Sequence, residues 1–138
     1  YCSTNAKFAL PEVKLGVIPG GMGTQILPKM IGIHRAKELI LSGKQLSSLE
    51  ALNLGVTSKI SSPDQLVTEA SELAEQISKN APIGLKFAKQ MVNLSFNLDL
   101  ESGRKLESQH LNYCLKTNDR KEALEAFMNK REPVFVGK

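Results

Sequence analysis

The sequence predicts an α/β fold in which a short region of extended segments and turns precedes a mostly helical remainder. Two observations carry this prediction. Over residues 6–19, proline and glycine interrupt the apolar residues at short intervals, which is typical of strands and turns. From residue 20 onward, apolar residues recur at helical spacing between cap signals, which predicts about seven helices.

The first helices follow a glycine-rich turn. The run PGGMGT, residues 19–24, leads into a predicted short helix over residues 25–31, and Gly32 ends that helix. A second short helix over residues 35–42 ends at Gly43, because glycine is favoured just beyond a helix C-cap. The turn therefore opens a pair of short helices that are joined by another glycine.

A third short helix and one strand are predicted next. Ser47 and Glu50 have the S-x-x-E spacing of a capping box, which starts a helix that Gly55 stops. The β-branched residues between positions 56 and 60 then form the best remaining strand candidate.

Four longer helices are predicted in the second half of the chain. Pro63 occupies the N1 position of the first, and Pro82 separates it from the second. Asp99 caps the third helix. Residues 119–122 repeat the capping-box spacing before a last helix that is expected to end near Pro133.

The composition fits a globular domain and argues against several classes of function. At 138 residues, with 41% hydrophobic and 23% charged residues, the chain is long enough to bury a core. The net charge of +4 is spread along the sequence, and only five Phe and two Tyr are present, so we expect no dedicated nucleic-acid surface. No apolar run reaches the roughly 18 residues that are needed to span a bilayer.

No pattern for a metal or nucleotide site is present. Cys2 and Cys114 lie far apart and belong to no C-x-x-C pair, and the two histidines lack a catalytic partner at recognisable spacing. The glycine-rich turn contains neither G-K-[ST] nor G-x-G-x-x-G, which argues against a loop that binds nucleotide phosphates. We therefore expect neither a metal ion nor a redox cofactor.

The glycine-rich turn and the acidic residue before it are the best candidates for a site. Gly20, Gly21 and Gly23 allow the backbone to approach a ligand closely and to take positive φ values. The helix that follows would direct the positive end of its dipole toward the same place. Glu12, flanked by a proline and a valine, can take up or release a proton, although a lone loop glutamate is also a common solvated side chain.

Residues 6–25, of sequence AKFALPEVKLGVIPGGMGTQ, resemble the segment of the enoyl-CoA hydratase/isomerase (crotonase) family that holds an acid/base glutamate. The resemblance continues through residues 36–39, 42–43, 51–55, 117–122, 126–127 and 130–131. The chain departs from the family pattern at Ala9, Met22, Ile26 and Ala123, and none of these positions holds a reacting group. Met22 is the departure that could narrow the acyl pocket.

The resemblance implies a crotonase-like fold, a superhelix of ββα turns. This chain would cover the end of that spiral and the mostly helical C-terminal oligomerisation region. Residues 1–60 would form the end of the ββα core with the glutamate and the glycine-rich turn, and residues 61–138 the helical trimerisation region. Tyr1 then falls inside the spiral, and the chain starts with neither Met nor a signal-peptide pattern, so we expect an amino-terminal half to precede it. In the family, that half supplies the oxyanion hole and a second glutamate.

The resemblance also implies roles for particular residues. Glu12 would exchange a proton with the substrate or water, the Gly20 N–H would help to hold that water, and Pro19 and Gly20 would contact the substrate. Phe127 and Lys130 match positions that contact the coenzyme A of a neighbouring subunit, with the ring near adenine and the ammonium near phosphate. Because they lie three residues apart, they are expected on one helical face. The alternative, in which Phe127 is core and Lys130 a solvated charge, stays open.

The activity that the resemblance implies is that of a CoA-thioester lyase, which adds water reversibly to a 2-enoyl-CoA in fatty-acid or branched-chain amino-acid breakdown. A homotrimer or hexamer without membrane insertion is expected. Residues 119–133 look most similar to methylglutaconyl-CoA and short-chain enoyl-CoA hydratases, which favours the mitochondrial matrix over the cytoplasm. Two alternatives remain open: a double-bond isomerase of the same family that uses only Glu12, and a non-catalytic subunit or RNA-binding protein. Residues 1–138 alone are expected to be inactive, because oxyanion-hole donors, worth roughly 3 kcal/mol each, lie outside them.

Overall fold

The computed structural model describes residues 1–138 and divides the chain into two compact units, Tyr1–Ser71 and Glu72–Lys138. Seven α-helices dominate, together with one 3-10 turn and four two-residue strands, so the prediction of about seven helices is confirmed. The predicted division into residues 1–60 and 61–138 was drawn by expected role. The two compact units instead meet inside the helix that spans Leu66–Ser78, labelled α4. None of the helices combines the length and the apolar character that crossing a bilayer requires.

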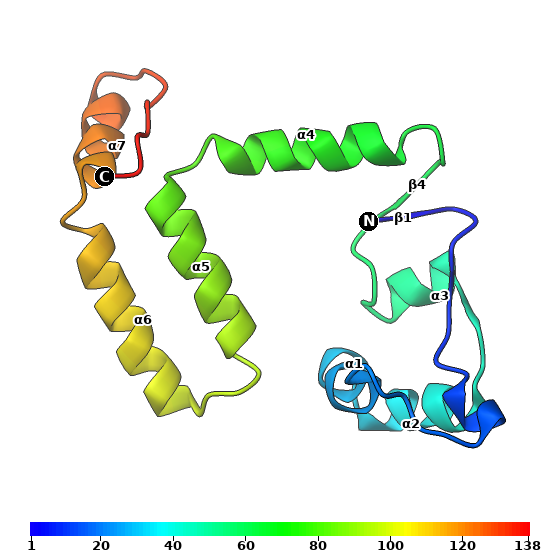
Figure 1. The fold of residues 1–138 in the computed structure, drawn as a ribbon. Coiled ribbons are helices and arrows are strands. Elements are labelled where there is room, and N and C mark those ends of the chain that lie inside the picture. The colour runs from blue at the N-terminus through cyan, green and yellow to red at the C-terminus, as the bar shows by residue number, and fades with distance from the viewer. The chain divides into compact units, whose positions relative to one another are not determined.

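The first unit combines two small sheets with three helices, before the start of α4 (Figure 1). β1 (Cys2–Ser3) pairs with β4 (Ile60–Ser61) in parallel, with Cys2 opposite Ile60. β2 (Lys7–Phe8) pairs with β3 (Leu46–Ser47) in antiparallel orientation, with Phe8 opposite Leu46. In chain order its elements are β1 (Cys2–Ser3), β2 (Lys7–Phe8), η1 (Glu12–Leu15), α1 (Gly23–Ile31), α2 (Ile33–Ser42), β3 (Leu46–Ser47), α3 (Ser48–Asn53) and β4 (Ile60–Ser61).

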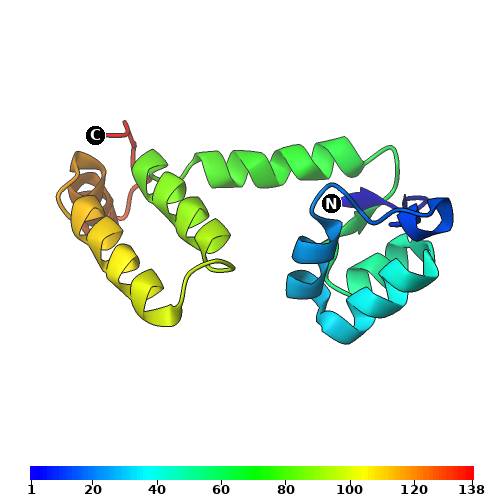
Figure 2. The same ribbon diagram turned by 60° about the horizontal axis from the view of Figure 1, so that its bottom comes forward.

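The core of the first unit lies where α1 and α2 meet the β2–β3 pair. α1 and α2 are joined through Gly32 and pack against each other (Figure 2). The buried residues at this place are Ile31, Ala36, Leu39 and Leu46, and the half-buried residues packed against them are Phe8, Leu27, Leu54 and Val56. The sheet pairing therefore fixes the chain on both sides of the segment that carries η1 and the glycine-rich turn.

The helix caps of the first unit lie largely where they were predicted. Gly32 ends α1, Gly43 ends α2 with a φ of 58°, and the reciprocal hydrogen bonds of a capping box between Ser47 and Glu50 start α3. The strand predicted between residues 56 and 60 is wrong except at its last residue. The reason is that the chain folds back after α3, since the N–H groups of residues 56 and 57 both donate to the last turn of that helix.

The second unit contains the remainder of α4 and a helical hairpin formed by α5 (Pro82–Leu94) and α6 (Leu100–Cys114), which lie side by side in Figures 1 and 2. Phe87 of α5 stacks on His110 of α6, with ring centroids 4.2 Å apart, and Tyr113 meets Phe87 edge-on at 5.5 Å. No residue of α4, α5 or α6 is buried in the chain. The predicted apolar faces of these helices are therefore largely open.

The last helix, α7 (Asn118–Met128), begins at a different cap from the one predicted. The Thr117 hydroxyl accepts from the Arg120 N–H at 3.2 Å, so Thr117 is the N-cap and Asp119 lies inside the helix. Asp119 is 2% exposed, and its carboxylate accepts from the N–H groups of Val136 and Gly137 at 2.8 and 2.9 Å. The predicted capping box at residues 119–122 is thus wrong, because a long-range partner takes the carboxylate.

The residues after α7 turn back along the helix as an extended tail, which Figure 1 shows beside α7. The N–H groups of Asn118 and Asp119, in the first turn of α7, donate to Lys138 O at 2.7 and 3.1 Å. α7 ends at Met128, earlier than the predicted end near Pro133. The helix is shorter because the chain reverses at residue 130, where the backbone takes a positive φ of 52°.

Candidate active site

Glu12 begins η1, a single 3-10 turn in the first unit. The Lys14 N–H donates to Pro11 O at 2.9 Å, the Val17 N–H donates to Glu12 O at 3.2 Å, and Gly16 ends the turn with a φ of 77°. Within this turn, Oε2 of Glu12 is buried and has no hydrogen-bond partner in the chain. Because a buried carboxylate oxygen without a donor is costly, this oxygen is suited to receive a hydrogen bond from a group outside the chain.

The glycine-rich turn does not have the backbone that was predicted for it. Gly20, Gly21 and Gly23 all avoid positive φ, so that part of the prediction is wrong. Met22 takes the left-handed conformation instead, with a φ of 65°, and serves as the N-cap of α1. A non-glycine residue in this conformation is strained. The strain at the turn is therefore concentrated at Met22.

The glycines of the turn serve two different purposes. A Cβ at Gly23 would lie 2.9 Å from Leu10 Cδ1 and 3.0 Å from the Cβ of the buried Pro19, so only glycine allows α1 to start against these residues. Gly20 and Gly21 have no atom within 4 Å of the place a Cβ would occupy. No carbonyl of the chain accepts from the Gly20 N–H, so this donor is available to a ligand.

A cavity of about 270 Å³ lies beside the turn. Gly21 and Gly23 contribute to its wall, and Lys44 is the one charged side chain in the lining. The apolar side chains of the lining include Phe8, Leu10, Ile26, Leu27, Met30 and Leu46. The cavity is therefore suited to an apolar group with a polar end.

The predicted site residues of the first unit lie outside the lining of this cavity. Pro19 is buried in the η1 and turn segment. Glu12 and Gly20 of the same segment carry an unpartnered carboxylate oxygen and an unpartnered N–H.

Lys44, which lines the cavity, was not predicted as a site residue, because no pattern distinguishes it from other surface lysines. Its ammonium lies 3.1 Å from Glu50 Oε1, and hydrogen bonds from Ser47, then from Lys44, lower the pKa of Glu50 to about 2.

Met22→Gly in the full-length protein should raise the free energy of unfolding by about 0.5 to 1 kcal/mol. Glycine removes the cost of the left-handed backbone, which exceeds the extra entropy that glycine has in the unfolded chain. The Met22 side chain is 61% exposed, so little packing is lost. Urea denaturation measures the effect. Met22→Ala keeps the Cβ and should leave stability within about 0.5 kcal/mol, and a loss of stability in the glycine variant would contradict the assignment of strain.

The second unit holds the other two predicted site residues. Phe127 lies in the last turn of α7 and is 83% exposed, so it is not part of the core of this chain. Lys130 is exposed and follows the C-cap of α7 with a φ of 52°. The prediction that both lie on one helical face is therefore wrong, because α7 ends before Lys130. They lie instead on either side of the turn that ends the helix.

Two further residues near this turn, Glu122 of α7 and Arg131, were not predicted as site residues. Arg131 makes a bidentate ion pair with Glu122, with Nη1–Oε1 and Nη2–Oε2 distances of 2.5 and 2.9 Å. Their spacing of nine residues matches no helical pair, so the spacing gave no signal for this ion pair.

No group of three or more His, Cys, Asp or Glu side chains is arranged to hold a metal ion.

The sequence matches a protein-family model described as enoyl-CoA hydratase/isomerase over residues 1–138. The chain is 42% identical over 135 residues to an enoyl-CoA isomerase/hydratase of Mycosarcoma maydis, an alignment that covers 98% of this chain and 49% of the relative. It is 41% identical over 135 residues to a mitochondrial enoyl-CoA hydratase of Pongo abelii, covering 98% of this chain and 47% of the relative. The chain thus spans about half the length of the curated relatives it matches.

A comparison with solved structures gives the same family. The crystal structure of an enoyl-CoA hydratase from Bacillus anthracis superposes on this chain with a TM-score of 0.95 and 38% sequence identity. The match covers 99% of this chain and 53% of the solved chain. The expected crotonase-like fold is therefore confirmed for the part of it that this chain represents.

Proposed function

Because the chain belongs to the enoyl-CoA hydratase/isomerase family, we propose that the protein adds water reversibly to the double bond of a 2-enoyl-CoA. The buried, unpartnered Oε2 of Glu12 is the observation that carries the proposal. Water addition needs a base that takes a proton from the attacking water and an acid that protonates the α-carbon. A carboxylate oxygen that lacks a donor in the chain is suited to hold such a water.

In the proposed reaction, the Glu12 carboxylate and the Gly20 N–H have different roles. Glu12 exchanges the proton, and the Gly20 N–H, which has no acceptor in the chain, holds the water from its other side. Pro19 contacts the substrate in this proposal, and it also lies beside the start of α1, where it leaves no room for a Cβ at Gly23. The cavity of about 270 Å³ beside the turn supports an apolar acyl group as the part of the substrate that enters here.

The negative charge that develops on the thioester oxygen needs hydrogen-bond donors, which we assign to a part of the protein that precedes this chain. In this proposal, residues 1–60 form the end of the ββα core and residues 61–138 the carboxyl-terminal helical region. The close match of residues 6–25 to the family's acid/base segment supports that placement. The reaction is redox-neutral, and we propose that neither a redox cofactor nor a metal takes part in it.

We further propose that Phe127 and Lys130 contact the coenzyme A portion of a substrate that is bound to a neighbouring subunit. An exposed ring can cover the face of a purine, and an ammonium can pair with phosphate. A homotrimer or hexamer is part of the proposal, supported by helices α4 to α6, which bury none of their residues within the chain. Leu100 is 90% exposed on α6, which also fits a covered subunit face.

The relatives bear on the substrate and the location. The relative from Pongo abelii is named as mitochondrial, which supports a mitochondrial matrix location in preference to the cytoplasm. Short-chain enoyl-CoA and 3-methylglutaconyl-CoA are the proposed substrates, on the resemblance of residues 119–133. The relative from Mycosarcoma maydis is named as an isomerase/hydratase, so double-bond isomerisation by Glu12 is the second candidate activity.

The full-length protein should hydrate crotonyl-CoA or 3-methylglutaconyl-CoA, whereas the chain of residues 1–138 should show no turnover. The difference is expected because the oxyanion-hole donors, each worth roughly 3 kcal/mol of transition-state stabilisation, are assigned to the preceding part. Loss of enoyl-thioester absorbance measures the reaction. Conversion of a 3-enoyl-CoA without hydration would favour the isomerase, and turnover by residues 1–138 would refute the assignment of the donors.

A further inference from the structure

The turn that ends α7 holds Lys130 in a conformation that lysine does not favour. Its φ of 52° is left-handed, and its N–H donates to Phe127 O at 3.2 Å. The Arg131 N–H donates to Ala126 O at 3.0 Å, which completes the Schellman ending of a helix. Glycine is the usual residue at this position, because a Cβ strains the left-handed backbone. The surrounding contacts must therefore impose this conformation on Lys130.

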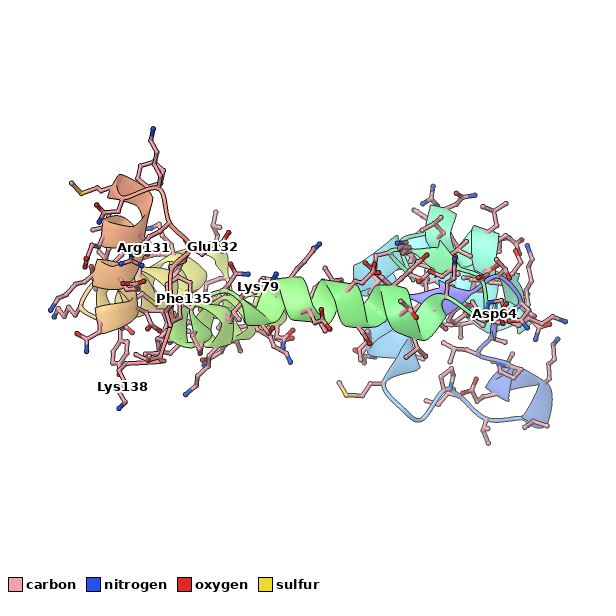
Figure 3. The ribbon with its side chains drawn as sticks, turned by 90° about the horizontal axis from the view of Figure 1, so that it is seen from above. Asp64, Lys79, Arg131, Glu132, Phe135 and Lys138 are labelled. Atoms are coloured by element: carbon pink, nitrogen blue, oxygen red, sulfur yellow. The ribbon has the colours of Figure 1, made fainter.

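Glu122 supplies those contacts from the middle of α7. Its two carboxylate oxygens accept from Nη1 and Nη2 of Arg131 at 2.5 and 2.9 Å, and Oε1 also accepts from the Val134 N–H at 2.8 Å. Figure 3 shows Arg131 turned back against α7. A bidentate pair of this kind fixes both distance and direction. The chain is thus tied to α7 immediately after Lys130 and again at Val134.

The ion pair between Glu122 and Arg131 is charged near neutral pH. The Arg131 guanidinium, and then the Val134 N–H, lower the pKa of Glu122 to about 2, and the carboxylate raises the pKa of Arg131. Because the Glu122 pKa falls on folding, the pair stabilises the fold above the carboxyl's ordinary pKa of 4.5, and that contribution is lost as the pH falls through about 2. The pair is therefore a permanent feature of the turn near neutral pH.

We propose that Glu122 and Arg131 are positioning residues for the coenzyme A contact, which they serve by fixing the turn between Phe127 and Lys130. This inference rests on the proposed function, in which the exposed Phe127 ring and the Lys130 ammonium bind the nucleotide end of a neighbouring subunit's substrate. The backbone direction at the Lys130 Cα decides from which side its flexible stem approaches the ring. The ion pair sets that direction without touching the ligand.

The test compares Glu122→Gln, Lys130→Ala and the double variant in the full-length protein, with KM and kcat for crotonyl-CoA as readouts. Each single variant should raise KM about tenfold, which corresponds to the loss of one charged contact. kcat should stay unchanged, because a nucleotide contact binds substrate and transition state equally. The double variant should raise KM no further, since Glu122 acts through Lys130.

Glu101→Gln is the matched control, because Glu101 makes an exposed ion pair with Lys105 on α6 at 2.6 Å. It should leave KM unchanged. Arg131→Lys keeps the charge but loses the bidentate fork, and it serves as the second variant if Glu122→Gln does not fold. It should also raise KM.

Three outcomes would overturn the inference, and they separate it from the proposed function. If Lys130→Ala leaves KM unchanged, the proposed coenzyme A contact fails and the inference fails with it. If Lys130→Ala raises KM while the folded Glu122 and Arg131 variants do not, the inference alone fails. If the effects of Glu122→Gln and Lys130→Ala on KM multiply in the double variant, Glu122 does not act through Lys130.

Discussion

Replacing Glu12 with glutamine in the full-length protein should lower kcat for hydration of crotonyl-CoA by about 10²- to 10⁴-fold. Glutamine has nearly the same shape and still forms hydrogen bonds, but it can neither accept the proton of the attacking water nor return one to carbon. The Oε2 atom of Glu12 is buried without a partner in the chain, so it is free to bind the attacking water in the proposed mechanism. KM should change little, because the substitution removes an interaction of the transition state.

The control for this experiment is Glu38→Gln, which changes an exposed glutamate of α2 and should leave kcat unchanged. Glu12→Asp keeps the acid but withdraws it by one methylene, so its kcat should lie between those of the wild type and the glutamine variant. A kcat for Glu12→Gln within a few-fold of the wild type, in a protein that folds and assembles normally, would remove Glu12 from the proton transfer.

The parts of the fold that could be predicted depend on residues close together in sequence. Glycine at a helix end, a serine three residues before a glutamate and an aspartate at an N-cap each act within one helical turn. Accordingly Gly43, the Ser47–Glu50 capping box and the Asp99 cap all lie where they were predicted. The N1 position predicted for Pro63 was wrong, because α4 begins at Leu66. The prediction at residues 119–122 was wrong although its spacing was equally good, because Asp119 takes partners seventeen and eighteen residues away.

The candidate site could be predicted only in part for the same reason. The identity of Glu12 and of the glycine-rich turn came from the family resemblance of their segment, since a lone glutamate carries little signal. The burial of its Oε2 and the left-handed backbone of Met22 depend on how the whole first unit folds, and no local pattern indicates them. The ion pair between Glu122 and Arg131 is likewise a contact that the reversal of the chain creates.

Asp119→Ala should lower the free energy of unfolding of the full-length protein by about 2 to 4 kcal/mol. The Asp119 carboxylate is 2% exposed and accepts from the N–H groups of Val136 and Gly137. Alanine would leave both donors without an acceptor, and a half-buried or buried donor that loses a charged partner costs about 1 to 3 kcal/mol. Urea denaturation measures the loss, and hydrogen exchange at the amides of Val136 and Gly137 should accelerate as the tail detaches from α7.

Two further variants separate this role from a general sensitivity of the fold. Asp64→Ala removes an exposed aspartate and should change stability by no more than about 0.5 kcal/mol. Asp119→Asn keeps the volume but sets an amide N–H against one of the two donors, so its stability should lie between those of the wild type and the alanine variant. If Asp119→Ala is as stable as the wild type, or if the Val136 and Gly137 amides stay protected in it, the tail is held by other contacts. The most direct of those would be the bonds from the first turn of α7 to Lys138 O, which do not involve the Asp119 carboxylate.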